Sequence, residues 1–396
     1  MKIKKWLERI FIKTNIKWFV LLFICVGLFI PAAVLCLKQP DWIYINNVED
    51  FEKFNDDLTG SYFIRNRQFF FDELPRIGDK DHPFKGIAHF DDSNVVFSKM
   101  NKSDDGLFGL FPYNQGTISG ISMYCSSINL NDQDLGNDIN FGFLCGVNEG
   151  VIKDCVLNAH IVLKSDSADS NSRIGNICGV NNGEITNCYV SGSVNSTNYL
   201  NLGGVAGECD GASNISKCTV KTQYVLNGVS KYVFGDIASF GNGKVENCSC
   251  NSRLYYSSPY DAENPVLLGG VIGKACGSLN IFKTYSDIEL HLSYDNYFGG
   301  CICDSNHYDV VLNSVLVRTL SLGTFSNHTR YSYLSPLNNE KLVTKSSFFV
   351  QPAIYDEALM SGVDLSGNII STIGWSENDW SYNSDLSNIE IKRKSK

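Results

Sequence analysis

Closely spaced aspartates are the side chains of this sequence that could most directly do chemistry. Two or three carboxylates on neighbouring strands can hold calcium, or can act as the acid and the base that cleave a glycosidic bond. None of the pairs returns at the same place in the repeat described below, so we interpret them as solvated turn residues and predict no catalytic residue. The pairs are Asp79/Asp81, Asp91/Asp92, Asp104/Asp105 and Asp132/Asp134.

Cysteines and histidines are the next candidates, because they are the usual ligands of zinc. The closest cysteines form C-x-C pairs, Cys248/Cys250 and Cys301/Cys303, which differ from the C-x₂-C spacing of zinc sites. The histidines share no motif such as H-E-x-x-H, and the sequence has no nucleophile elbow. We therefore predict neither a metal site nor a cofactor. The histidines are His82, His89, His160, His291, His307 and His328.

A repeat of about thirty residues organises the chain and must position all of these side chains. The segment FGFLCGVNEGVIKDC, residues 141–155, returns as IGNICGVNNGEITNC at residues 174–188, and four weaker copies follow. Successive first glycines are 33, 28, 32, 34 and 30 residues apart. A period of this length is typical of solenoids, propellers and arrays. The marker glycines are Gly142, Gly175, Gly203, Gly235, Gly269 and Gly299.

Each copy is predicted to form short strands joined by tight turns, since apolar runs alternate with Asn-Gly and Asp-Gly turns and no helical periodicity is present. A propeller blade needs four strands, more than such a repeat comfortably holds, so we predict an all-β parallel solenoid. Like residues would then stack in columns along the axis. The expected apolar column is Ile152, Ile185, Ile215, Val245, Ile281 and Val311, and the expected column of small side chains is Cys155, Cys188, Cys218, Cys248, Thr284 and Ser314.

The stacked cysteines leave two interpretations open. Neighbours about 4.8 Å apart fall within the Cα window of a disulfide, and an oxidising exterior would favour a few bridges. Long-lived free thiols would instead indicate an anaerobic habitat.

The copy at residues 141–157, FGFLCGVNEGVIKDCVL, resembles the GLUG motif of bacterial surface and adhesin-like proteins, a run of the form Gly-Gly-Leu-Val-Gly-x-Asn-x-Gly-x-Ile-x-Asn-Cys. The resemblance covers about residues 84–322. It departs from the motif at Ser239 and Cys303, which replace the last glycine, and at Thr284 and Ser314, which replace the cysteine. The resemblance implies a right-handed parallel β-helix outside a bacterial cell and implies no catalytic activity.

The N-terminus is predicted to anchor the chain in a membrane. Residues 18–37 are uncharged and long enough for one transmembrane helix, and the basic residues before them favour a cytoplasmic N-terminus. A cleaved signal peptide is the alternative, but its apolar region is usually shorter. The expected organisation is a cytoplasmic segment 1–17, a transmembrane helix 18–37, an N-terminal cap 38–83, a β-helix 84–323 and a C-terminal cap 324–396.

The N-terminal cap is expected to contain a short helix that begins at Asn47 as N-cap and presents Phe51, Phe54 and Leu58 on one face. Such a helix can cover the open end of a solenoid core.

Charge excludes one class of partner. Residues 39–396 carry 26 basic and 41 acidic groups, a net charge of −15, which argues against binding nucleic acid.

We expect a single-pass cell-membrane protein whose extracellular β-helix is a non-catalytic scaffold for adhesion or for binding an unknown surface ligand, a glycan or a protein. The alternatives are a glycan-active enzyme, either a polysaccharide lyase or a hydrolase, and a purely structural envelope protein. The variable inserts 164–172 and 255–265 are expected to form loops on the binding side.

Overall fold

The computed structural model describes residues 40–391 with internal gaps. Within this part no helix has the length and the apolar character needed to span a bilayer. The predicted cytoplasmic segment 1–17 and transmembrane segment 18–37 lie outside the described residues. The gaps are residues 66, 132–137, 165–171, 198–200, 228–232, 258–265, 293–296, 314, 322–329, 333–341, 346–347, 351–379 and 384–387.

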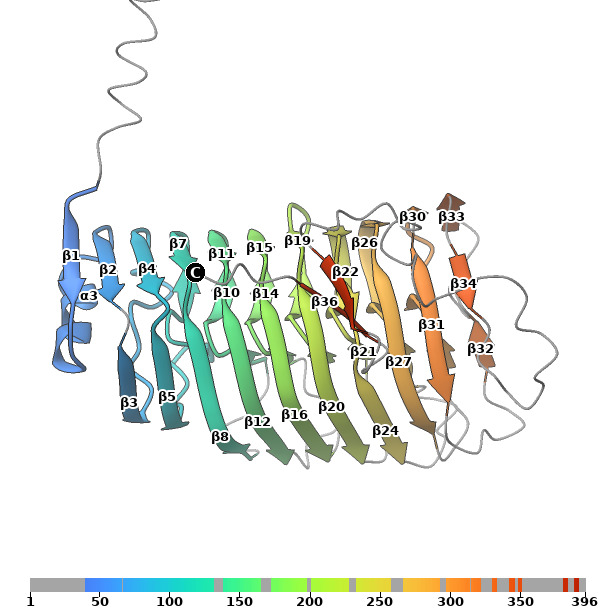
Figure 1. The fold of residues 1–396 in the computed structure, drawn as a ribbon, viewed down its shortest axis with the longest axis horizontal. Coiled ribbons are helices and arrows are strands. Elements are labelled where there is room, and N and C mark those ends of the chain that lie inside the picture. Colours follow the sequence, from blue (N-terminus) through green and yellow to red (C-terminus); the bar gives the residue numbers. More distant parts are fainter. Residues whose placement is uncertain are drawn as a thin grey trace, which may run out of the picture. The chain divides into compact units, whose positions relative to one another are not determined.

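The described chain from Ile43 onward forms a parallel β-solenoid of the right-handed type with about 7 turns and almost no helix (Figure 1). Strands from successive coils stack in register into three parallel sheets, so the predicted all-β solenoid is confirmed. Each complete coil passes from the third sheet through the first to the second, and hydrogen bonds run along the stack.

The strand bounds follow this order. The first sheet contains β1 (Trp42–Ile45), β2 (Ser61–Arg65), β4 (Ile87–Asp91), β6 (Tyr113–Asn114), β7 (Thr117–Ser119), β10 (Cys145–Asn148), β11 (Val151–Lys153), β14 (Cys178–Asn181), β15 (Glu184–Thr186), β18 (Ala206–Cys209), β19 (Asn214–Ser216), β22 (Ala238–Glu246), β26 (Ile272–Phe282), β29 (Ile302–Asp304), β30 (Val310–Asn313) and β33 (Leu342–Lys345). The second contains β3 (Gln68–Glu73), β5 (Asn94–Lys99), β8 (Ser122–Leu130), β12 (Val156–Lys164), β16 (Tyr189–Thr197), β20 (Thr219–Asn227), β23 (Ser249–Cys250), β24 (Arg253–Ser257), β27 (Tyr285–Leu292), β31 (Leu316–Ser321) and β34 (Phe348–Val350). The third contains β9 (Asn140–Phe141), β13 (Arg173–Gly175), β17 (Asn201–Gly203), β21 (Val233–Gly235), β25 (Leu267–Gly269), β28 (Tyr297–Gly299) and β32 (Arg330–Ser332), while β35 (Trp380–Asn383) and β36 (Asn388–Ile391) form an antiparallel pair.

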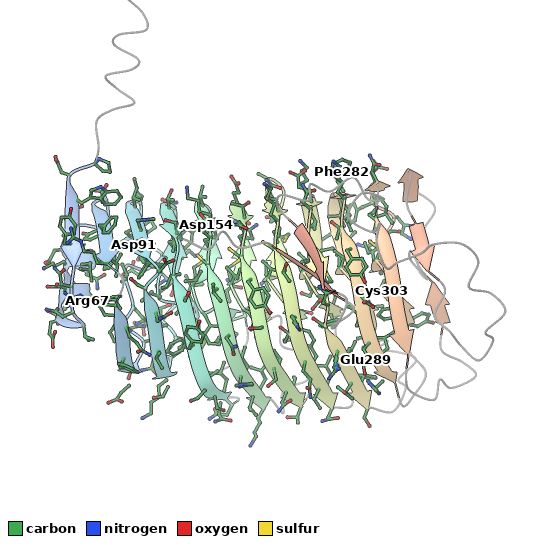
Figure 2. The ribbon with its side chains drawn as sticks, viewed as in Figure 1. Arg67, Asp91, Asp154, Phe282, Glu289 and Cys303 are labelled. Atoms are coloured by element: carbon green, nitrogen blue, oxygen red, sulfur yellow. The ribbon has the colours of Figure 1, made fainter. Side chains whose placement is uncertain are left out.

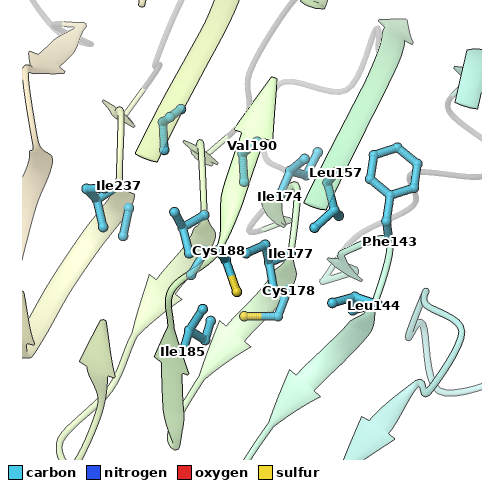
Figure 3. Close-up of a cluster of buried hydrophobic side chains, with 14 of the residues drawn as sticks. Phe143, Leu144, Leu157, Ile174, Ile177, Cys178, Ile185, Cys188, Val190 and Ile237 are labelled. Atoms are coloured by element: carbon cyan, nitrogen blue, oxygen red, sulfur yellow. The ribbon is translucent and has the colours of Figure 1, made fainter. Parts of the chain in front are cut away.

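The predicted columns are present through five coils. Ile152 pairs with Ile185, and the column continues through the next three predicted members, all of them buried. The marker glycines from Gly175 to Gly299 also stand opposite one another. Figure 3 shows Cys178 and Cys188 packed among the isoleucines of this core.

The prediction for the last coil was wrong by one residue. Ile281 pairs with Leu312, while Val311 pairs with Asn280 and is only half-buried. The turn before β30 contains one residue more than its counterpart in β26, and both Asn306 and His307 there have positive φ. Ser314 lies outside the described residues, and the register of β31 puts Val315 in line with Thr284.

A left-handed residue at one corner of the coil explains the cysteine column. Asp154 has φ 58° and Asn187 has φ 54°, and each N–H donates to a carbonyl of the next coil. This corner turns the following residue into the core, where the thiol of Cys155 donates to the carbonyl of Lys153 at 3.1 Å. The corner repeats with Lys217, Asn247 and Lys283, which precede Cys218, Cys248 and Thr284.

The end of the core is covered by a short helical segment that consists of η1 (Glu49–Glu52) and α3 (Lys53–Asp56). Its N-cap residue is Val48 and not Asn47 as predicted, although Asn47 Oδ1 accepts the N–H of Asp50 at 2.9 Å. Phe51 and Phe54 are buried, and the Phe51 ring packs edge-on against Phe69 at 5.2 Å. The parallel stack itself begins at β2 and β3, inside the expected cap 38–83, and continues into β32–β34, inside the expected cap 324–396.

Candidate functional site

Two of the predicted acid pairs meet in one hollow near the N-terminal end of the solenoid. Asp79 and Asp81 come from the loop after β3, and Asp104 and Asp105 come from the loop after β5. Together with basic side chains they line a cavity of about 740 Å³, which we call the acidic hollow. The remaining lining residues are Asn55, Leu58, Arg76, Gly78, Lys80, His82 and Ser103.

Two carboxyls of the acidic hollow, those of Asp79 and Asp105, accept hydrogen bonds from neighbouring turn residues. The N–H of His82 donates to Asp79 Oδ1 at 2.7 Å, and this bond is the main reason why the pKa of Asp79 is lowered. Asp105 accepts a hydrogen bond from the Ser103 hydroxyl. A carboxyl with a lowered pKa is ionised at neutral pH and cannot serve as a general acid there. Asp79 is therefore excluded as the general acid of a glycosidase-like site in this hollow at neutral pH.

The other candidate residues do not converge. Asp91 ends β4 (Figure 2), away from the lining of the acidic hollow, and Asp92 occupies a left-handed corner with φ 51°. Asp132, Asp134 and His328 lie outside the described residues. His89 and His160 each contact a serine of the next coil, at 3.0 and 2.8 Å. Within the described ranges, no group of three or more potential metal ligands comes together.

A shallow trough crosses five coils of the first sheet. A column of turn glycines forms its floor, and we call the whole feature the glycine trough. These glycines are Gly86, Gly116, Gly150 and Gly183. Its volume is about 570 Å³, and its walls are lined mainly by polar side chains and by Ile87 and Val151. The sequence predicted tight glycine turns within the repeats but did not predict a surface feature. The wall residues are Lys85, Ile87, Gln115, Thr117, Glu149, Val151, Glu184, Ala212 and Asn214.

A buried asparagine ladder supports the floor of the glycine trough. Asn114 Nδ2 donates to Asn148 Oδ1 at 2.7 Å, and Asn148 Nδ2 donates to Asn181 Oδ1 at 2.8 Å. Asn114 Oδ1 also accepts the N–H of Gly116, the residue two positions later. The Asn-x-Gly turns are thus tied both locally and between coils.

Glu149 is the charged residue of the trough with the clearest fixed position. Its carboxylate accepts from Tyr113 Oη at 2.6 Å and from Gln115 Nε2 at 2.8 Å. Partial burial, with a smaller contribution from Glu149, raises the pKa of Tyr113 to about 12, so the phenol remains a donor. These bonds leave further acceptor positions on the exposed carboxylate for a ligand.

The cysteines form no described disulfide. All twelve that the structure describes are free, and all except Cys276 are buried. Burial raises the pKa of the Cys155, Cys188 and Cys218 thiols well above the ordinary value. Since the thiolate is the reactive form, these columns are structural.

Thiol labelling should report this burial. In a variant with Cys25 and Cys36 replaced by serine, the folded chain should react with a thiol reagent at Cys276 at most, because the eleven other thiols are buried. Unfolding without reductant should expose all twelve. Mass spectrometry of the labelled chain checks the count, and fewer than twelve labels after unfolding would show that disulfides had formed.

Sequence reasoning missed one titratable side chain, Asp236. It follows the marker glycine Gly235, where the other coils have glycine, asparagine or, in the first, Phe143, and this departure was the available signal. Its carboxyl is buried, with Oδ1 and Oδ2 at 2.7 and 2.8 Å from Ser252 Oγ. Burial raises the pKa of Asp236 to about 8, and the titratable groups beside it are Tyr224 and Cys250. No described cation neutralises it, so the group is a neutral acid in the core at neutral pH.

Comparison with known proteins adds little beyond these observations. No family model and no curated protein sequence matches the chain. A solved structure from Bacteroides ovatus, described as that of a candidate immunoglobulin A1 protease, is 15% identical, with a TM-score of 0.48 over 90% of this chain and 93% of its own. A second, named IgA1 protease, is 13% identical, with a TM-score of 0.43 over 78% of this chain and 21% of its own. Likenesses this weak carry no information about activity.

Proposed function

We propose that this chain is a non-catalytic scaffold, displayed outside a bacterial cell, that binds an extended glycan or protein ligand in the glycine trough. The GLUG-like repeat and the apolar segment 18–37 motivate the location, with the segment acting as a single-pass membrane anchor.

The state of the carboxyls supports a non-catalytic role most directly. Asp236 has a raised pKa, but it is fully buried in the core. A glycoside hydrolase site needs an accessible acid that is protonated at the working pH beside a second, ionised carboxyl. In the acidic hollow Asp79 is held ionised, so it cannot be that acid.

The form of the glycine trough suits binding of a linear polymer. It runs along the stack, so a ligand in it would cross successive coils and meet a different wall residue at each one. Four successive coils contribute one polar wall residue each. In order along the stack these are Lys85, Gln115, Glu149 and Glu184. Positive and negative contacts at spaced positions favour an extended ligand of mixed polarity over a compact one.

Binding should depend on the two acids of the trough. The full-length chain would be tested against immobilised cell-surface and extracellular glycans and proteins. Replacing Glu149 and Glu184 by alanine should weaken binding roughly tenfold or more, because each removes a charged hydrogen-bond partner. Glu49→Ala with Glu52→Ala, an equal charge change on the exposed η1, serves as the control and should bind as the parent chain does. Equal affinity of both double variants would contradict the assignment of the trough.

A second candidate function rests on the acidic hollow. Two acid pairs beside Arg76, Lys80 and His82 give the carboxylate and cation content of a glycan-active site. Because Asp79 is held ionised, hydrolysis there would need one of Asp81, Asp104 or Asp105 to donate the proton, whereas elimination would need a base, which Asp79 could supply. Incubating the chain with a polymer that it binds separates the two functions, because an enzyme would shorten the polymer and a scaffold would leave it intact.

A further inference from the structure

The strand β3 ends the second sheet and leaves one edge open. It is the first strand in the order of that sheet, and it pairs with β5 on its other side. The N–H of Asn94 donates to the carbonyl of Arg67, and in a parallel ladder the backbone groups of alternate residues point to opposite sides. The N–H and C=O of Phe70 therefore point to the open edge, where no described strand pairs with them.

Phe70 is also the most exposed of the large apolar side chains that the structure describes, at 63%. It stands opposite Val96 of β5, which stands opposite Tyr124 of β8, itself 39% exposed. These three side chains form an apolar stripe on the solvent face that ends at the open edge. Apolar surface that reaches an unpaired strand edge is the usual mark of an interaction surface.

The sequence of the edge is complementary to itself. If a second β3 pairs antiparallel with its Phe70 opposite the first, Arg67 falls opposite Glu73 and Gln68 falls opposite Asp72, each pair occurring twice. Arg67 donates to the carbonyl of Asn46, and Glu73 accepts from Asn101, and both side chains remain exposed with further hydrogen-bonding capacity. Charge complementarity of this kind under two-fold symmetry specifies a second copy of the chain as the partner.

We propose that β3 is a dimerisation edge, through which two copies of this chain join their second sheets about a two-fold axis at Phe70. The Phe70 backbone groups of the two copies then form a hydrogen-bonded pair. The two apolar stripes join into one, which runs from Tyr124 of one copy to Tyr124 of the other. Figure 2 shows Arg67 at the end of the stack, where the second copy would lie. The contact involves one short strand from each copy, so the dimer is weak and reversible.

Cross-linking tests the register. In a full-length chain in mild detergent, with Cys25, Cys36 and Cys276 replaced by serine, Phe70→Cys should be joined to its own copy by a short bis-maleimide. Gln68→Cys mixed with Asp72→Cys should cross-link as a heterodimer, while either alone should not, because only unlike residues are opposite each other. Tyr124→Cys, which is also exposed but lies two strands from the axis, is the control and should remain monomeric.

Sedimentation gives an independent readout. The parent chain should associate as its concentration rises from about 1 to 100 µM, the range expected for a small interface. Phe70→Glu should remain monomeric at all these concentrations, because two carboxylates would meet at the axis. Tyr308→Glu, which changes an exposed aromatic residue near the other end of the solenoid, should associate as the parent does. A monomeric parent chain, or absence of the Phe70→Cys cross-link, would overturn the proposal.

Discussion

Asp236→Asn should stabilise the folded chain, and the gain should grow as the pH rises from about 4 to about 8. The pKa of Asp236 is raised from 3.8 to about 8, mainly because burial disfavours its charged form. Between these two values the unfolded chain loses the proton and the folded chain keeps it, so the parent loses stability as pH increases. Each pKa unit corresponds to about 1.4 kcal/mol. We expect a gain on the order of 2–4 kcal/mol near pH 7, since an amide carries no charge and can still bond to Ser252.

Urea unfolding at several pH values measures this gain directly. Below about pH 4 the two chains should differ little, because Asp236 is then neutral in both states. Asp154→Asn is the matched control, since Asp154 is an exposed acid at a corner of the coil, and its effect should not grow in the same pH range. A destabilisation by Asp236→Asn that is the same at every pH would show that the carboxyl is retained for its packing and hydrogen bonds alone.

Gly150→Ala should destabilise the solenoid strongly. A Cβ at Gly150 would lie 2.1 Å from the carbonyl oxygen of Gly116 in the preceding coil. Both atoms belong to backbone that is fixed by the stack, so the coils must separate to relieve the overlap. We expect a loss of roughly 3 kcal/mol or more in the free energy of unfolding. The same contact between successive coils recurs at Gly86, Gly116 and Gly183, which explains why the trough floor is made of glycine.

Gly211→Ala is the control for Gly150→Ala, because it makes the same chemical change in a turn where a Cβ would meet no atom within 4 Å. It should change the free energy of unfolding by less than about 1 kcal/mol. Comparable losses in the two variants would contradict the explanation by contact between coils.

The interior could be predicted from the sequence because each buried position of one coil requires a similar residue type in the next coil, so the pattern recurs along the chain. Ile152 and Cys155 recur in phase, and the period alone places their equivalents on one column. The prediction failed at Val311 because a single extra residue in a turn shifts the register without changing the pattern of residue types. The identity of residue 312, a leucine, was compatible with either alignment, and only the hydrogen-bonded ladder separates them.

The surface could be predicted far less well. Asp79 and Asp104 lie 25 positions apart in a part of the chain without a clear period, so nothing in their spacing indicated that one hollow would hold both. The glycine trough depends on how turns stack in space, and the open edge of β3 depends on which strand comes first in its sheet. Asp236 is the one acid among the residues that follow the marker glycines, the others being glycine, asparagine and phenylalanine. Its significance depends on burial, which residue type alone does not establish.

A degradation assay tests the central claim, a scaffold that binds without catalysis, most directly. The full-length chain would be incubated with each polymer that it binds, and chain length and new reducing or unsaturated ends would be followed over time. We predict that the polymer is bound and remains intact. Cleavage that persists through purification and disappears in Asp79→Asn or Asp105→Asn, while folding is retained, would contradict the scaffold and assign the acidic hollow as an active site.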